Sequence, residues 1–170
     1  WGLFHWLNAP FWPAFVASML MLDLTIYAQH VAFHTIPLLW RLHRMHHTDL
    51  DFDVTTALRF HPLEIVLSML IKIAVIVIVG LPALAVLLFE ILLNATALFS
   101  HADISLPPRL DRVLRWFLVT PDMHRIHHSV ATVETNSNYG FCLSLWDRLF
   151  ESYRAQSLRN PAEMTIGLKE

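Results

Sequence analysis

Three long apolar runs, at residues 11–34, 63–79 and 83–99, constrain the fold of this chain more than any other feature. The first run is long enough to cross a lipid bilayer, which takes about 20 residues, and the other two are slightly short for a full span. Gly80 and Pro82 separate the second run from the third, so these two are expected to form antiparallel helices joined by a tight turn. We therefore predict an all-α integral membrane protein, in which this hairpin is tilted or only partly inserted.

The arginines indicate which side of the membrane carries the connecting segments. None lies within the apolar runs, and seven of them flank the histidine motifs and the hairpin: Arg41, Arg44, Arg59, Arg109, Arg112, Arg115 and Arg125. Because the hairpin returns the chain to its starting side, all seven share one side, whereas the turn at 80–82 carries no charge. The positive-inside rule therefore predicts that this side is cytoplasmic, at the bacterial inner membrane or the endoplasmic reticulum. The net charge of −2 gives no basic signature of nucleic-acid binding.

Residues 109–119 predict a different kind of helix. Its apolar side chains follow the spacing i, i+3, i+4, i+7, i+8, at Leu110, Val113, Leu114, Phe117 and Leu118. Charged side chains occupy the opposite face, so we expect an amphipathic helix that lies in the membrane interface, with an ordinary surface helix as the alternative. We expect residues 1–170 to form a single domain, shortened at its N-terminus because the chain begins at Trp1 without a methionine.

Histidine is unusually frequent, with eleven copies against a single cysteine, Cys142. One cysteine excludes a disulfide framework and a cysteine-ligated zinc or iron–sulfur site. An HxxxH pair occupies 30–34, and the motif HxxHH occurs twice, at 43–47 and 124–128. On a helix these spacings place the rings on one face, within reach of one ion. With the histidine that ends the third apolar run, nine residues are candidate metal ligands: His30, His34, His43, His46, His47, His101, His124, His127 and His128.

Metal binding explains these clusters better than packing does. So many imidazoles would carry a large desolvation cost in a hydrophobic chain, and ligation offsets it because neutral imidazole binds iron, zinc and copper well. Nine donors exceed the needs of one ion. We therefore predict a dinuclear metal site in a cytoplasmic, histidine-rich helical cap, with the two HxxHH copies as two of its walls. His61 is a further candidate, as a tenth ligand, as a group supporting a ligand, or as the residue that starts the next helix.

Two acidic residues are expected to hydrogen-bond to the histidines of this metal site, which we call the cage. Asp23 and Tyr27 lie on one helical stripe with the HxxxH pair. An acid inside an apolar helix is costly, so we expect Asp23 to fix an imidazole tautomer directly or through Tyr27, with a helix–helix hydrogen bond as the alternative. Asp147 is expected either to supply a supporting carboxylate or to form a structural salt bridge with Arg148.

The apolar hairpin contains further polar residues. Asn94 shares a helical stripe with Glu90 and His101, and it is expected to orient a ligand or to bind the second metal through water. Lys72 and Glu90 each lie nine residues from Leu81 at the turn. In an antiparallel hairpin they reach the same depth, so we expect an intramembrane ion pair between them.

The order HxxxH, HxxHH, HxxHH between apolar hairpins resembles the fatty acid hydroxylase/sterol desaturase superfamily of membrane non-haem di-iron enzymes. Four further stretches are similar to that family: "DLTIYAQHVAFHTIPLLWRLHRMHH" at 23–47, "RFHPLE" at 59–64, "NYG" at 138–140 and "WDRLFESY" at 146–153. The resemblance covers about 23–153. It implies two iron ions, O2 as co-substrate, and hydroxylation or desaturation of a lipid of the sterol, fatty acyl or sphingolipid type.

The choice of metal and of function follows from the chemistry of this ligand set. Histidine ligands also hold zinc, but zinc has no redox chemistry, so O2 activation favours iron. The sequence contains no flavin, haem or nucleotide motif, so a separate reductase with a ferredoxin or a cytochrome b5-like protein is expected to supply electrons. The alternatives are a membrane metal transporter or sensor and a non-catalytic homologue filled with zinc. A transporter is disfavoured because its ligands would follow a path through the membrane.

Overall fold

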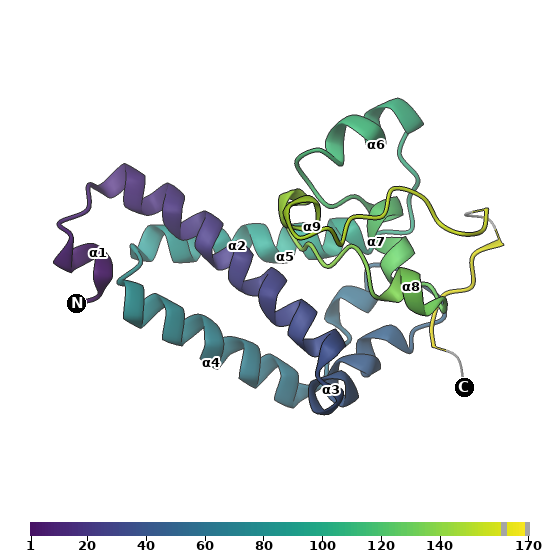
Figure 1. The fold of residues 1–170 in the computed structure, drawn as a ribbon, viewed down its shortest axis with the longest axis horizontal. Helices are drawn as coiled ribbons and strands as arrows, with labels where there is room; N and C mark the ends of the chain where they lie inside the picture. The colour runs from purple at the N-terminus through teal and green to yellow at the C-terminus, as the bar shows by residue number, and fades with distance from the viewer. Residues whose placement is uncertain (161–162, 169–170) are drawn as a thin grey trace.

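The computed structural model describes residues 1–160 and 163–168, and within these ranges the chain is helical, with no β-strand (Figure 1). The predicted all-α class is therefore confirmed. The elements are α1 (Leu3–Trp6), α2 (Phe11–Thr35), α3 (Pro37–His47), the 3-10 turn η1 (Thr56–Leu58), α4 (Pro62–Val79), α5 (Ala83–Ser100), α6 (Pro108–Leu114), α7 (Pro121–His127), α8 (Thr132–Thr135) and α9 (Leu145–Leu149).

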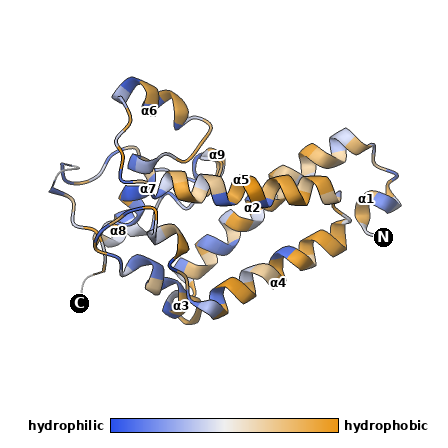
Figure 2. Cartoon of the chain, turned by 180° about the vertical axis from the view of Figure 1, so that it is seen from behind, coloured by the Kyte–Doolittle hydropathy of each residue, from blue (hydrophilic) through white to orange (hydrophobic). Residues whose placement is uncertain are grey.

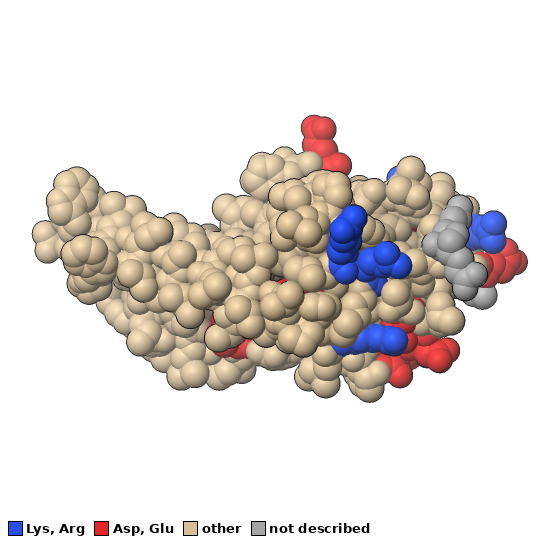
Figure 3. All heavy atoms as spheres, turned by 90° about the horizontal axis from the view of Figure 1, so that it is seen from below, with Lys and Arg blue, Asp and Glu red and all other residues tan. Residues whose placement is uncertain are grey.

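Helices α2, α4 and α5 are long and apolar enough to cross a membrane. Of the apolar stretch of each helix, only 17% is buried inside the molecule in α4 and only 22% in α5. Most of the apolar surface of these two helices therefore faces outward. In Figure 2 hydrophobic colour covers these two helices, whereas α7 and much of α3 are hydrophilic. On the face shown in Figure 3, Lys and Arg gather at one end of the molecule. Apolar helices with so little cover suit a lipid environment rather than water.

The turn between α4 and α5 returns the chain to the end from which α4 started. Gly80 ends α4 in the left-handed region, at φ 75°, and its N–H donates to the Ile76 carbonyl at 2.9 Å. A side chain at this position would also collide with the Trp1 carbonyl oxygen, so both backbone and space require glycine. As a result α2 ends, α4 begins and α5 ends at the same end of the molecule, beside the segments that we call the cap: α3, η1 and α6 to α9 (Figure 1).

Prolines start the helices that carry or adjoin the histidine motifs. Ile36 is extended, at φ −93° and ψ 115°, and Pro37 takes the first position of α3. Pro62 and Pro121 begin α4 and α7 in the same way, and Thr120 caps α7 with its side chain. Proline fits this position because its missing N–H would have no intrahelical acceptor. The break at residue 36 turns α3 against α2, which brings the first HxxHH motif beside the HxxxH pair.

Asp23 joins the C-terminal part of the cap to α2. Its carboxylate accepts a hydrogen bond from Trp146 Nε1 at 2.8 Å and from the backbone N–H groups of Cys142 and Leu143 at 3.3 Å. The predicted contact of Asp23 with an imidazole is not found among the described residues. The carboxylate instead satisfies donors of the segment that packs on α2, which corresponds to the alternative of a hydrogen bond between elements.

The amphipathic helix predicted at 109–119 is shorter in the structure. α6 ends at Leu114, and residues 115–117 form a turn. Leu118 then bridges to Leu143, and the Val119 N–H donates to the Cys142 carbonyl at 3.1 Å, so pairing with a distant loop replaces the last helical turn. Val113 and Phe117 remain 58% and 65% exposed, which keeps an apolar face on this segment.

Candidate metal centre

All nine candidate histidines meet at the cap end of the three long helices. They form a five-histidine group and a four-histidine group, and within each group one nitrogen per residue lies within 4.8 Å of the others. The five-histidine group contains His30, His34, His43, His47 and His127, and the four-histidine group contains His46, His101, His124 and His128. Each HxxHH copy therefore contributes to both groups, which explains why the motif occurs twice. The groups adjoin, because the His47 and His128 rings stack with centroids 4.4 Å apart.

Backbone carbonyls fix the orientation of four rings. The Nδ1 atoms of His30 and His127 lie 2.8 Å and 2.7 Å from the carbonyl oxygens of Tyr139 and Ser137. The Nδ1 atoms of His46 and His101 lie 3.1 Å and 2.8 Å from the carbonyl oxygens of residues 56 and 97. Because a carbonyl oxygen only accepts, Nδ1 carries the proton in each ring and Nε2 presents a lone pair.

Lone pairs converge in the four-histidine group. His101 Nε2 lies 3.1 Å from His46 Nε2 and 3.0 Å from His124 Nε2. For His46 and His101 the carbonyl contacts leave both facing nitrogens without a proton, an arrangement that repels unless a cation lies between them. Two nitrogens that each lie about 2.1 Å from one ion, at a right angle, are about 3.0 Å apart. The spacing therefore suits a shared metal ion.

The five-histidine group contains buried nitrogens that bond nothing else in the part of the chain that the structure describes. These are Nε2 of His30, His43 and His127, and both ring nitrogens of His34 and His47. A buried polar atom without a partner costs about 1–3 kcal/mol, so a group of them inside one site requires compensation. Metal coordination would supply it, and the donor sets of both groups fit a bound ion.

Burial keeps the cage histidines in the form that binds metal. Desolvation lowers the pKa of His43 to about 3 and that of His101 to about 4. Desolvation, followed by repulsion from neighbouring rings, also holds the pKa values of His46, His47 and His124 well below the ordinary range. Since only the neutral imidazole has a free lone pair, these rings are ready to coordinate a cation at neutral pH.

Glu64 is a supporting residue that the sequence analysis did not assign to the cage. Its Oε1 lies 2.6 Å from His43 Nδ1, and the two side chains are 6% and 3% exposed. A carboxylate behind a coordinating imidazole orients the ring and raises its basicity. The only sequence signal is an acid in the first turn of an apolar helix, within the stretch "RFHPLE".

Asp147 is linked to a cage histidine through the backbone of residue 139. Its carboxylate accepts from the N–H groups of Tyr139 and Gly140 at 2.7 Å and 2.8 Å, and the carbonyl of Tyr139 in turn holds His30. Burial raises the pKa of Asp147 to about 6. The alternative salt bridge with Arg148 is not found in the described ranges, since that guanidinium lies over an aromatic ring and donates to a backbone carbonyl.

Three other predicted residues have different partners. The Tyr27 hydroxyl lies 2.8 Å from Ser152 Oγ, and Asn94 Nδ2 donates to the main-chain oxygen of Glu90, one turn earlier on its own helix. His61 belongs to neither histidine group, and its Nδ1 caps α4 by accepting the Leu63 N–H at 3.2 Å. In the structure His61 is the residue that starts α4.

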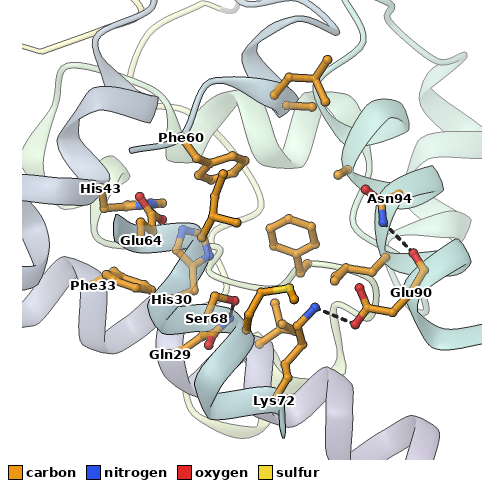
Figure 4. A pocket seen from close by; sticks show the side chains of 18 residues that line it. Gln29, His30, Phe33, His43, Phe60, Glu64, Ser68, Lys72, Glu90 and Asn94 are labelled. Atoms are coloured by element: carbon orange, nitrogen blue, oxygen red, sulfur yellow. Dashed lines mark hydrogen bonds and ion pairs between the residues drawn. The ribbon is translucent and has the colours of Figure 1, made fainter. Parts of the chain in front are cut away.

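An apolar cavity of about 330 Å³ adjoins the five-histidine group, between α2, α4 and α5 (Figure 4). Its wall includes His30 and His43 together with Phe33 and Phe60. Leu58 also lines it and is 72% exposed, so the cavity reaches the outer surface. The predicted ion pair lies in the same wall, with Lys72 Nζ 2.6 Å from Glu90 Oε1. A long apolar ligand entering here would lie against two cage histidines.

Comparison with known proteins agrees with this description. A sequence model of the fatty acid hydroxylase family matches residues 15–152. The chain is 27% identical to the ornithine lipid hydroxylase OlsE of Rhizobium tropici, over 95% of this chain and 49% of that protein. It is 28% identical to the alkylglycerol monooxygenase of Homo sapiens, over 83% of this chain and 31% of that protein. The chain thus spans half or less of the length of these relatives. No solved structure matches it. The match over most of its length shows that this chain belongs to the fatty acid hydroxylase family.

Proposed function

We propose that this chain is the catalytic domain of a membrane di-iron oxygenase that uses O2 to hydroxylate or desaturate a C–H bond of a lipid. The observation that carries this proposal is the junction of two groups of neutral histidines with an apolar cavity that lies between membrane-type helices. The names of the relatives, a lipid hydroxylase and an alkylglycerol monooxygenase, support the reaction class. We propose that all of residues 1–170 belong to this one domain.

The nine histidines would hold the two metal ions, five in one group and four in the other. Bound iron would supply the O2 activation and redox change that protein side chains lack, whereas zinc in the same sites would not. The carbonyls of Tyr139 and Ser137 and the carboxylate of Glu64 keep the imidazoles oriented, with the lone pairs of Nε2 facing inward. This support would hold the cage geometry constant during turnover.

The cavity would hold the apolar tail of the substrate. Ile26 and Phe141 form part of its wall beside His30 and His43, so the tail would displace water next to the cage. A chain held in this position presents a C–H bond to the metal centre without covalent attachment to the protein, and catalysis depends on that positioning.

The electrons would come from a separate donor, a reductase with a ferredoxin or a cytochrome b5-like protein, acting from the cytoplasmic side. The nine histidines lie in the cap and on the adjoining ends of α2 and α5, at one end of the long helices (Figure 1), where such a protein would bind. The concentration of all nine donors at this end, rather than along the helices, argues against a metal transporter.

Anaerobically purified, iron-loaded protein tests the proposal. With a generic ferredoxin–reductase pair, NADPH, O2 and a bacterial lipid extract, we expect a lipid product heavier by one oxygen atom or lighter by two hydrogen atoms in mass spectrometry. The zinc-loaded protein is the matched control, because it keeps the fold without redox activity. Loss of O2 consumption and of product in both samples would refute the function.

A further inference from the structure

The cavity contains polar side chains that are not part of the metal cage. Gln29 Nε2 donates to Ser68 Oγ at 2.8 Å, and Lys72 Nζ donates to Glu90 Oε1 at 2.6 Å. Figure 4 shows both pairs on the cavity wall, with Gln29 and Ser68 between the cage histidines and Lys72. Polar residues within membrane-spanning helices are costly, and they usually bind a substrate or another polar group.

These side chains keep unused hydrogen-bonding capacity. The Gln29 Oε1 atom is shielded from solvent and has no partner in the described part of the chain. Lys72 is 8% exposed, and its ammonium group has three N–H donors, one of which reaches Glu90. An acceptor and a donor are therefore available in the same apolar cavity.

We propose that Gln29 and Lys72, the latter paired with Glu90, bind a neutral amide or hydroxyl group of the lipid substrate; this inference rests on the proposed lipid-oxidising function. Gln29 Oε1 accepts the N–H or O–H of that group, and Lys72 donates to its oxygen. The lysine and glutamate charges already balance each other, so a charged headgroup would enter the cavity without a counter-ion, which is unfavourable. A neutral group with both a donor and an acceptor fits this set.

The position of this site would determine which carbon is oxidised. Lys72 follows Glu64 by eight residues on α4, and Glu64 contacts the cage histidine His43. At 1.5 Å per residue, Ser68, which binds Gln29, lies about 6 Å and Lys72 about 12 Å along α4 from Glu64, so the polar site lies about 6–12 Å from the cage. The protein would thus select a carbon by its distance from the polar group rather than from the end of the tail.

A binding measurement with two matched probes tests the inference. N-methylhexadecanamide carries a carbonyl and an N–H donor, whereas methyl hexadecanoate has the same length and carbonyl but no donor. The zinc-loaded protein in detergent excludes turnover, and calorimetry gives both dissociation constants. We expect the amide to bind about tenfold more tightly, as for one additional buried hydrogen bond.

The variants separate the two halves of the site. Gln29→Leu should reduce the amide preference to about twofold or less, and Lys72→Met with Glu90→Leu should weaken both probes, because both carry the carbonyl. Thr25→Val, one turn earlier on α2, is the matched control, since among the described residues its hydroxyl bonds only the Met21 carbonyl of its own helix. Zinc content near that of the wild type shows that each variant retains the cage.

Equal binding of the two probes by the wild type, or an intact amide preference in Gln29→Leu, would overturn the inference. If the iron-loaded protein still oxidises a lipid in that case, the proposed function stands and only the recognition site is lost. If the wild type prefers the amide, and Gln29→Leu abolishes that preference, but the iron-loaded protein oxidises no lipid with O2, then the proposed function is refuted and the proposed binding site is retained.

Discussion

Replacing Glu64 by leucine should selectively weaken metal binding in the five-histidine group. The carboxylate lies 2.6 Å from His43 Nδ1, the side chains are only 6% and 3% exposed, and a leucine of similar size would fill the space without offering an acceptor. Leaving that N–H unsatisfied costs about 1–3 kcal/mol. Removal of such a supporting group typically lowers metal affinity about 10–100-fold, which corresponds to about 1.4–2.8 kcal/mol. The two magnitudes agree.

Zinc titration against a competing chelator measures this effect without redox chemistry. We expect one tight site to persist in Glu64→Leu, because the four-histidine group does not contain His43. Glu64→Gln keeps an acceptor oxygen and should lose less affinity. His61→Ala is the control: His61 starts the same helix, so its loss should lower the melting temperature but leave both zinc affinities unchanged. Two sites of wild-type affinity in Glu64→Leu would refute the role of the carboxylate.

Three further changes test other parts of the account. His46→Ala and His127→Ala, one from each group, should each lower iron content and abolish lipid oxidation, and full activity with two irons in either variant would contradict the ligand assignment. Lys72→Met should destabilise the protein by about 3 kcal/mol, because it leaves the Glu90 carboxylate without its partner on an apolar helix of the membrane-spanning type, and adding Glu90→Leu should recover part of this loss. Equal melting temperatures for the single and double variants would exclude the ion pair. A cysteine at the exposed Val133, with Cys142→Ser, should react with an impermeant thiol reagent only after intact cells are opened, and labelling of intact cells would reverse the proposed orientation.

The membrane helices and the cage histidines could be recognised from the sequence because their signals are local. The long helices begin and end within one residue of the predicted apolar runs. This agreement is possible because each run is continuous in sequence and because the residues that end two of the helices, Pro37 and Gly80, closely follow the runs. The HxxHH motif likewise could be interpreted from helix geometry alone, which places its histidines on one face. The structure brings both copies together. The division of each copy between two groups was not predictable, because it depends on the angle between α3 and α7.

The partners that support the cage could not be predicted, because they are distant in sequence. Glu64 reaches a histidine on another helix, 21 residues away. The acceptors for His30 and His127 are backbone carbonyls, which every residue possesses and which leave no side-chain signal. The helical stripe of Asp23 predicts a contact with the cage, yet the donors to its carboxylate come from a segment about 120 residues later. Such contacts depend on tertiary packing.

X-ray absorption on anaerobically purified, iron-loaded protein, combined with iron quantification, tests the central claim most directly. The account predicts close to two irons per chain, with imidazole nitrogens at about 2.0–2.1 Å as the dominant ligands, because nine buried histidine rings converge in two adjoining groups. A single iron per chain, or a first coordination sphere made mainly of oxygen, would contradict it.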